Sequence, residues 1–290
     1  MKKVVILMPT YNDWESVQKL LVEIEIVISK IKNFKFKCVI INDCSTSDMP
    51  NIIKPENLDT IKIVNMKKNI GHARCNAFGL RYIITNEIYD YVIIMDSDGE
   101  DRPVEIKDLI DKIEEIPDIS VVARRVKRSE GAIFQSLYQV HKIITFFFTG
   151  KKINFGNYSC LTKEDTKILS DKPSLWSSFS GSLMKHLKNL NGVNSFRGLR
   201  YYGPSKMSLL SLILHSFSII AVFKYTVFLR TTLMIILMSF FVEKFGSIII
   251  AMIMMLVFFN LIIFLVSMRE NERALFESNN NILNENEITH

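Results

Sequence analysis

The chain has 290 residues, of which 48% are hydrophobic, with a formal net charge of +6 and a mean hydropathy of +0.18. This hydrophobic content is high for a purely soluble protein. The basic residues form no run with interleaved aromatic residues, which argues against nucleic acid as a partner. The apolar excess is concentrated between residues 207 and 268, where only Lys224, Arg230, Glu243 and Lys244 are charged. The change in composition predicts a domain boundary near residue 205.

Short apolar strands alternate with amphipathic helices over the first part of the chain. The strands are expected at residues 4–8, 39–41, 61–64, 91–95 and 119–123, and the helices at about 13–31, 71–84 and 104–115. Such alternation predicts an α/β fold with a mostly parallel, Rossmann-like sheet and helices on both faces.

Polar clusters follow three of these strands, at Pro9–Asp13, Asn42–Asp48 and Asp96–Asp101. In open parallel sheets, ligands bind beyond the carboxyl ends of the strands. Because all three clusters stand at such ends, the sequence predicts that they gather along one edge of the sheet and form a binding site there.

Asp96 and Asp98 are the central candidates for chemistry. Two carboxylates one residue apart, on a turn that leaves a buried strand, can hold Mg²⁺ or Mn²⁺ together with substrate phosphate oxygens. Such a cation offsets the charge of a nucleoside diphosphate leaving group. Glu100 is a third candidate ligand. The alternative is a solvated acidic turn, but the match with two other polar strand ends favours the metal site.

Four motifs together resemble a known family. They occur in the order Met8-Pro9-Thr10-Tyr11-Asn12-Asp13, Ile41-Asn42-Asp43-Cys44-Ser45, Asn69-x-Gly71-x-x-x-x-Asn76 and Met95-Asp96-Ser97-Asp98. This pattern resembles family 2 of the inverting glycosyltransferases, which have the GT-A fold, and within it the branch of dolichyl-phosphate mannose synthase and the bacterial polyprenyl-phosphate glycosyltransferases. The resemblance covers about residues 3–205.

The resemblance implies roles for several residues. Pro9, Tyr11 and Asp13 would line the nucleotide pocket, and Asp43 would reach the base. Asp13 stands where relatives often have Glu, while Asn42 and Cys44 replace the Asp and Gly of the commoner Asp-Asp-Gly-Ser form. An arginine that contacts the diphosphate is expected at Arg124 or Arg125, where the alternative is a solvated basic loop.

Gly156-Asn157-Tyr158-Ser159 resembles a segment that often reads Gly-Asp-Phe-Arg in related bacterial enzymes. Because Asn157 cannot accept a proton, it cannot act as a general base. A phosphate acceptor is already ionised near neutral pH and needs no base, whereas a sugar hydroxyl would need one from elsewhere.

Three cations, Arg197, Arg200 and Lys206, stand just before the apolar region. We expect them to capture the acceptor's phosphate and the donor's diphosphate. The alternative is a general attraction to anionic lipid headgroups.

The apolar region predicts a membrane anchor. Residues 206–224 are expected to form an interfacial amphipathic helix, and residues 225–268 two transmembrane helices joined by a turn at Glu243-Lys244. The positive-inside rule then places domain 1–205 and the tail 269–290 on the cytoplasmic face of the cell membrane. Four cysteines without paired spacing agree with a reducing compartment. The Asn- and Glu-rich tail is expected to be disordered.

Taken together, the sequence predicts inverting transfer of a sugar from a nucleotide-sugar donor to a polyprenyl phosphate. One alternative keeps the fold but uses a hydroxyl of a lipid-linked glycan or glycolipid as acceptor. Another is a non-catalytic membrane protein that binds nucleotide sugars. The sequence leaves open whether the chain forms a homo-oligomer.

Overall fold

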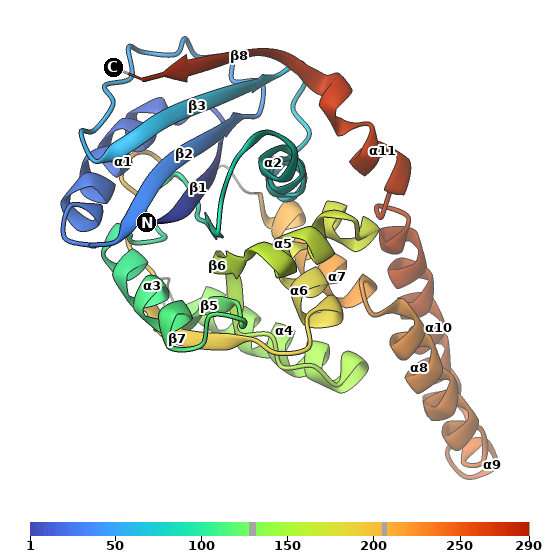
Figure 1. Ribbon diagram of the computed structural model, residues 1–290. Helices are drawn as coiled ribbons and strands as arrows, with labels where there is room; N and C mark the ends of the chain where they lie inside the picture. The colour runs from blue at the N-terminus through green and yellow to red at the C-terminus, as the bar shows by residue number, and fades with distance from the viewer. Residues whose placement is uncertain (128–131, 205–207, 290) are drawn as a thin grey trace.

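The protein is described by a computed structural model that covers residues 1–127, 132–204 and 208–289. Its centre is an eight-stranded sheet (Figure 1). The strands are β1 (Lys2–Thr10), β2 (Phe34–Asn42), β3 (Leu58–Met66), β4 (Tyr91–Ile94), β5 (Val121–Lys127), β6 (Phe155–Thr162), β7 (Asn191–Phe196) and β8 (Ile282–Ile288). Their order in the sheet is β7-β5-β6-β4-β1-β2-β3-β8, and only β6 and β8 run antiparallel to their neighbours.

Helices cover both faces of the sheet, as predicted. One face packs against α1 (Trp14–Ile28), η1 (Pro103–Glu105) and α3 (Ile106–Glu115). The other packs against α2 (His72–Asn86), α5 (Lys163–Ser170), η2 (Pro173–Trp176) and α6 (Phe179–His186). Strand β1 is buried on both sides, and its side chains alternate between the two faces. Ile6 packs in the core under α1 and α3, and Leu7 packs in the core under α2, α5 and α6. This two-sided burial explains why the inner strands read as continuous apolar runs.

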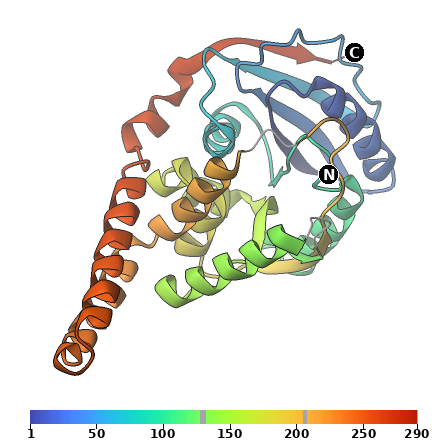
Figure 2. The ribbon, with the colours of Figure 1, turned by 180° about the vertical axis from the view of Figure 1, so that it is seen from behind.

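Two helices project away from the sheet as a hairpin, which Figure 2 shows from behind. Helix α8 (Lys224–Ser239) leads through the short α9 (Val242–Phe245) into α10 (Ser247–Ser267). Within the described parts of the chain, one helix is long and apolar enough to cross a membrane, the candidate span that begins at Ser247. Helix α7 (Leu209–Ala221) and α8 would form a second candidate only if taken together, and they meet at a bend of 84°.

A third apolar cluster joins the base of this hairpin to the rest of the protein. Ile220 of α7, Val227 of α8 and Ile263 of α10 are buried together, and Phe148 of α4 (Ala132–Thr149) packs against them. The apolar side chains of α4 that point outward remain exposed, including Phe146 and Phe147. The sequence did not predict α4, which lengthens the apolar surface formed by α7, α8 and α10.

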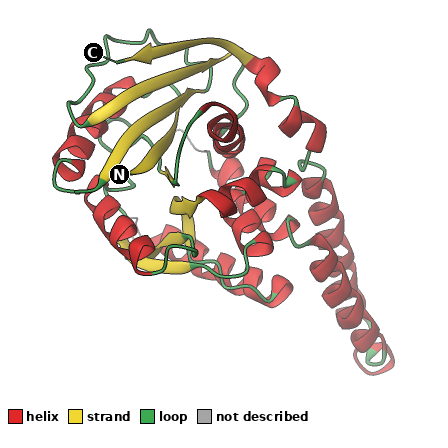
Figure 3. Ribbon diagram, viewed as in Figure 1, coloured by secondary structure: helices red, strands yellow, loops and turns green. Residues whose placement is uncertain are grey.

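The described part of the C-terminal tail, up to residue 289, is ordered, which corrects the expectation of a disordered tail. After α10 the chain forms α11 (Glu272–Phe276) and η3 (Ser278–Asn281), and then β8 pairs antiparallel with β3 (Figure 3). Its polar side chains are also used: the Tyr82 hydroxyl donates to Glu285 at 2.5 Å, and the Asn65 amide donates to Asn284 at 2.6 Å. The backbone N–H and C=O groups at the edge of β3 form hydrogen bonds with a neighbouring strand whether or not the side chains of that strand are hydrophobic.

Candidate active site

The carboxyl ends of β1, β2 and β4 meet at one edge of the sheet. The Asp43 amide donates to the Thr10 carbonyl at 2.9 Å, and the Ser97 hydroxyl donates to the Pro9 carbonyl at 2.8 Å. The three polar clusters identified in the sequence therefore lie side by side. Asp13, Asp98 and Glu100 are all contacted by one short stretch of the chain, residues 197–202.

The turn of residues 96–101, called the acidic turn, is stabilised by hydrogen bonds to its own side chains. Asp101 is 5% exposed and accepts a hydrogen bond from the Asp96 amide at 2.9 Å. Asp98 accepts one from the Glu100 amide at 3.0 Å, and Gly99 has a positive φ of 88° that a residue with a Cβ rarely adopts. Burial and the nearby Asp96 charge raise the pKa of the Asp98 carboxyl to about 6. The raised pKa of Asp98 thus reflects how closely the carboxyl groups of this turn are placed.

His72 lies directly beside Asp96. Its Nε2 is 3.1 Å from Asp96 Oδ1 and 2.8 Å from the amide nitrogen of Asn157. Burial opposes charge on His72, but the carboxylates of Asp96, Asp98 and Asp101 outweigh it and raise the pKa of the imidazole. Sequence reasoning missed this residue. The sequence signal that could have found it is its position at the start of α2, because the first turn of this helix lies at the same sheet edge as Asp96.

Residues 197–202, here called the basic segment, fold over the acidic turn. Arg200 pairs with Asp98, with Nη1 at 2.7 Å from Oδ2, and also with Asp13, while Arg197 pairs with Glu100. Backbone hydrogen bonds run in parallel, from the Tyr201 amide to the Asp98 carbonyl and from the Gly198 amide to the Glu100 carbonyl. The predicted arginines are therefore at the site, bound to carboxylates.

The aromatic ring of Tyr201 packs on the acidic turn. A Cβ added at Gly99 would lie 2.5 Å from this ring, so the turn needs glycine for space as well as for its backbone conformation. The Tyr201 hydroxyl donates to Glu23 of α1 at 2.5 Å. The basic segment is thereby fixed to both the turn and the first helix.

Arg124 and Arg125 point in different directions because neighbouring side chains on a strand face opposite sides. The charge of Arg125 acts on both Asp96 and Asp101, so it faces the site. Arg124 instead lines a separate basic cavity with Lys151, Lys152 and Lys188. Of the two candidates for a diphosphate contact, Arg125 has the suitable position.

Asp43 is 4% exposed, and both of its oxygens are engaged. One accepts from the Ile70 amide at 2.7 Å and the other from the Gly71 amide at 2.9 Å. The carboxylate thus fixes the start of α2, and the predicted contact with a base stays a prediction. Tyr11 lies at the rim of the site and is 39% exposed. Lys206 lies outside the described residues.

Asp96 and Asp98 present oxygen atoms suited to a hard divalent cation. Their side chains are 19% and 16% exposed, so both remain accessible. In the described parts of the chain, no three or more His, Cys, Asp or Glu side chains form a ready-made metal cluster. Mg²⁺ commonly binds through one or two carboxylates plus substrate phosphates, and this pair fits that mode. Glu100 is held by Arg197.

The sequence matches the model of glycosyl transferase family 2 over residues 5–176. The chain therefore belongs to this family, as its four motifs indicated. It is also 26% identical over 172 residues to an uncharacterized glycosyltransferase of Synechocystis sp., a match that covers 58% of this chain and 52% of the relative. The chain thus spans about half the length of this curated relative.

Solved structures share the fold. The chain is similar to glucosyl-3-phosphoglycerate synthase from Mycobacterium tuberculosis in complex with Mn²⁺, uridine-diphosphate-glucose and phosphoglyceric acid. The TM-score is 0.54 at 14% identity, over 78% of this chain and 80% of that one. A second complex of the same synthase, with Mn²⁺, uridine-diphosphate and phosphoglyceric acid, gives 0.55 at 13% identity, over 78% of both chains. This likeness confirms the predicted GT-A fold.

Proposed function

We propose that the protein is an inverting glycosyltransferase that moves a sugar from a nucleotide sugar to a polyprenyl phosphate at the cytoplasmic face of the cell membrane. The observation that carries the proposal is the contact between the basic segment and the acidic turn, just before the apolar helices. From Tyr201 to the first residue of α7 is eight residues, which span at most about 28 Å when fully extended. This short connection supports the proposal, because it would keep the site within reach of an acceptor held in a membrane.

The membrane placement is supported by the shape and charge of the hairpin. Helix α10 has 21 residues and is about 32 Å long, which matches the hydrocarbon core of a bilayer. Four cations stand near the base of the hairpin and one lysine stands in the turn at its tip, so the positive-inside rule places the base in the cytosol. These cations are Lys224, Arg230, Arg269 and Arg273, against Lys244 at the tip.

We assign the chemistry as follows. An acceptor phosphate oxygen attacks the anomeric carbon, the bond from that carbon to the donor diphosphate breaks, and the configuration inverts. An ionised phosphate needs no base, which agrees with Asn157 at the position beside Asp96. Arg197 and Arg200 would exchange carboxylate partners for phosphate oxygens, and Arg125 would join them in stabilising the leaving group.

A Mg²⁺ or Mn²⁺ ion held by Asp96 and Asp98 would supply Lewis-acid stabilisation of the departing diphosphate. Asp13 and Tyr11 would line the nucleotide pocket beside it. Since the similar synthase was solved with uridine-diphosphate-glucose and Mn²⁺, uridine-diphosphate sugars are the first donors to test.

The test is a transfer assay with the full chain purified in detergent, Mn²⁺, a panel of nucleotide sugars and undecaprenyl phosphate. The expected product is a polyprenyl phosphate sugar identified by mass spectrometry. Asp98→Asn should lower kcat/KM at least about 100-fold, because a group that stabilises the leaving diphosphate is lost. Asp118→Asn, at an exposed position outside the site, should leave it unchanged.

Two outcomes would count against the proposal. Full activity of Asp98→Asn would overturn the role of the acidic pair. A product that carries the sugar on a glycan hydroxyl, with none on the lipid phosphate, would show that the acceptor is the hydroxyl of a lipid-linked glycan or glycolipid instead. Absence of donor turnover with every nucleotide sugar would favour a binding protein.

A further inference from the structure

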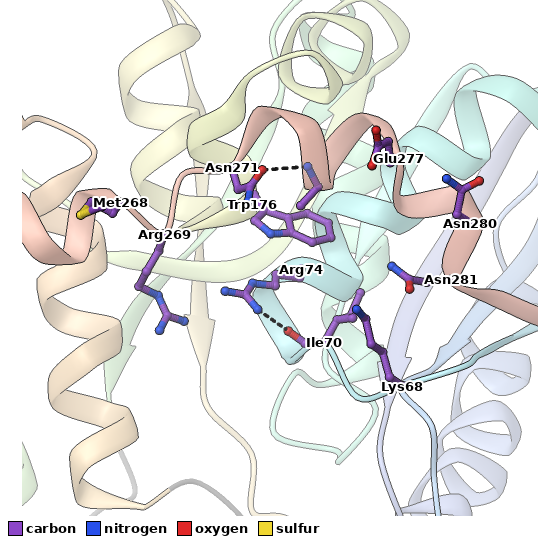
Figure 4. Close-up of a pocket in the computed structure, with 11 residues that line it drawn as sticks. Lys68, Ile70, Arg74, Trp176, Met268, Arg269, Asn271, Glu277, Asn280 and Asn281 are labelled. Atoms are coloured by element: carbon purple, nitrogen blue, oxygen red, sulfur yellow. Dashed lines mark hydrogen bonds between the residues drawn. The ribbon is translucent and has the colours of Figure 1, made fainter.

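A second polar cavity of about 370 Å³ lies between the start of α2, η2 and the turn that joins α10 to α11. Figure 4 shows its lining side chains converging from these elements, which are far apart in the sequence. None of them belongs to the acidic turn or the basic segment. The lining includes Lys68, Arg74, Trp176, Arg269, Asn271 and Asn281.

Two arginines in this cavity lack a hydrogen-bond partner at a buried nitrogen. The Nε atoms of Arg74 and Arg269 are both buried, and neither has a partner among the described residues. Among the described residues, the Arg74 side chain has one hydrogen bond, a long one of 3.4 Å from Nη1 to the Ile70 carbonyl. Burial lowers the pKa of the Arg74 guanidinium, and the positive charge of Arg269 lowers it further. Two cations thus repel each other across a partly dry space, an arrangement that an anion would stabilise.

The neighbouring carboxylates are already engaged. Glu277 also lines the cavity, but its side chain pairs with Arg273 at 2.8 Å. Asp43 attracts Arg74 electrostatically, yet its oxygens accept the amides of Ile70 and Gly71. Neither of these carboxylates forms an ion pair with the two arginines among the described residues, so their charge suits an anion from outside the chain.

The remaining lining suits a small polar group on an apolar support. The Arg74 guanidinium lies 5.7 Å from the centre of the Trp176 ring, which holds it in place by a cation–π contact. Asn271 and Asn281 add amide groups, and Lys68 adds a third cation. A guanidinium pair binds phosphate oxygens with good geometry.

The position of the cavity indicates where such a group comes from. Arg269 is the second residue after the end of α10, the helix that fits a membrane span. At that depth the polar headgroups of the lipids begin. The phosphate of a lipid headgroup would therefore lie at the same depth as Arg269.

We propose that this cavity binds the phosphate of an anionic membrane lipid between Arg74 and Arg269, with Lys68 beside it. The lipid source rests on the proposed placement of α10 in a membrane, and the site itself is independent of sugar transfer. A soluble phosphate shares the same chemistry, so the experiment below compares the two sources.

The test measures binding by the full chain in the absence of nucleotide sugar and acceptor. In nanodiscs of phosphatidylcholine with added phosphatidylglycerol, thermal unfolding should shift upward compared with phosphatidylcholine alone. Native mass spectrometry should detect retained phosphatidylglycerol. The double variant Arg74→Gln/Arg269→Gln should bind phosphatidylglycerol about tenfold or more weakly. The control Lys30→Gln removes an exposed cation after α1, outside the cavity, and should bind as the unchanged protein does.

A further measurement guards against loss of folding. Without anionic lipid, the double variant should unfold at the same or a higher temperature than the unchanged protein, because two repelling charges are removed. Equal lipid binding by both proteins, or a lower unfolding temperature of the double variant without lipid, would overturn the proposal. Inorganic phosphate that stabilises the protein as strongly as phosphatidylglycerol would overturn the lipid source and keep the phosphate site.

Discussion

Charge pairing dominates the candidate site at the scale of single residues. Asp98 faces Arg200, Glu100 faces Arg197, and Asp96 faces His72. Such pairs offset the repulsion between carboxylates that would otherwise destabilise the turn. Under the proposed function, a nucleotide diphosphate would bind by exchange of partners, because guanidinium groups bind phosphate and carboxylate with similar geometry.

The sequence located the acidic residues but not all of their partners. Asp96 and Asp98 follow a conspicuous apolar strand, so local pattern sufficed. His72 has no local pattern and comes to Asp96 only because α2 starts at the same sheet edge. The opposite directions of Arg124 and Arg125 follow from strand alternation, but which of them faces the site depends on the pairing of β5 with β6 and β7.

Glu87 offers a prediction about stability at acid pH. Its side chain is 4% exposed and pairs with Lys62 at 2.7 Å and Lys37 at 3.1 Å. Although burial opposes its charge, these lysines lower the pKa of the Glu87 carboxyl below its usual 4.5. The stabilisation is therefore complete above pH 4.5 and is lost as pH falls through the lower pKa of the folded state.

The measurement compares Glu87→Gln with the unchanged protein in detergent. At pH 7 the variant should be less stable by about 1–3 kcal/mol, because two lysines lose a buried partner. The difference should shrink as pH falls below 4.5. Glu56→Gln, at an exposed position, should show no such trend. A difference that stays constant down to pH 3 would contradict the assignment.

At the scale of elements, sequence pattern found the strands and helices that carry their own apolar periodicity. The strands β1 to β5 and the helices α1 to α3 were expected at their observed places in the chain, although β2 begins five residues earlier and β5 ends four residues later than expected. Strands β6 and β7 were not predicted. Strand β8 was missed because it contains Asn284, Glu285, Asn286 and Glu287, whose composition resembles that of disordered tails. Its conformation comes from pairing with β3, a contact between residues more than two hundred positions apart.

Deletion of residues 282–290 tests the contribution of β8. The truncated chain should unfold at a temperature lower by about 5 °C or more and aggregate more readily, because the edge of β3 is uncovered. Differential scanning fluorimetry and light scattering measure both effects. The point variant Leu283→Ser, at a side chain that is 63% exposed, should behave as the unchanged protein does. Equal unfolding temperatures for the truncated and full chains would contradict this expectation.

At the scale of the whole molecule, both ends of the helical hairpin are tied to the same sheet. The chain enters the hairpin after β7 and returns from it to β8. If α10 crosses a bilayer, α8 must first carry the chain across it and α10 must bring it back, so that the tip is on the far side. The bend of 84° between α7 and α8 allows α7 to lie along the surface while α8 enters it.

Labelling with a membrane-impermeant maleimide checks this topology in intact cells. Lys244→Cys, in the turn at the tip, should react without permeabilisation. Asp118→Cys, in the exposed loop before β5, should react only after the membrane is opened. The reverse pattern, or equal labelling of both positions in intact cells, would rule out the proposed orientation.

The late position of β8 in the chain also bears on how the protein is made. A ribosome releases β8 only after the entire hairpin has emerged. If the hairpin inserts into a membrane, the edge of β3 that pairs with β8 stays uncovered during the insertion. With the proposed orientation, completion of the sheet would depend on the return of the chain across the membrane. A chain whose hairpin failed to return would leave β8 on the wrong side and present an open sheet edge to quality-control proteases.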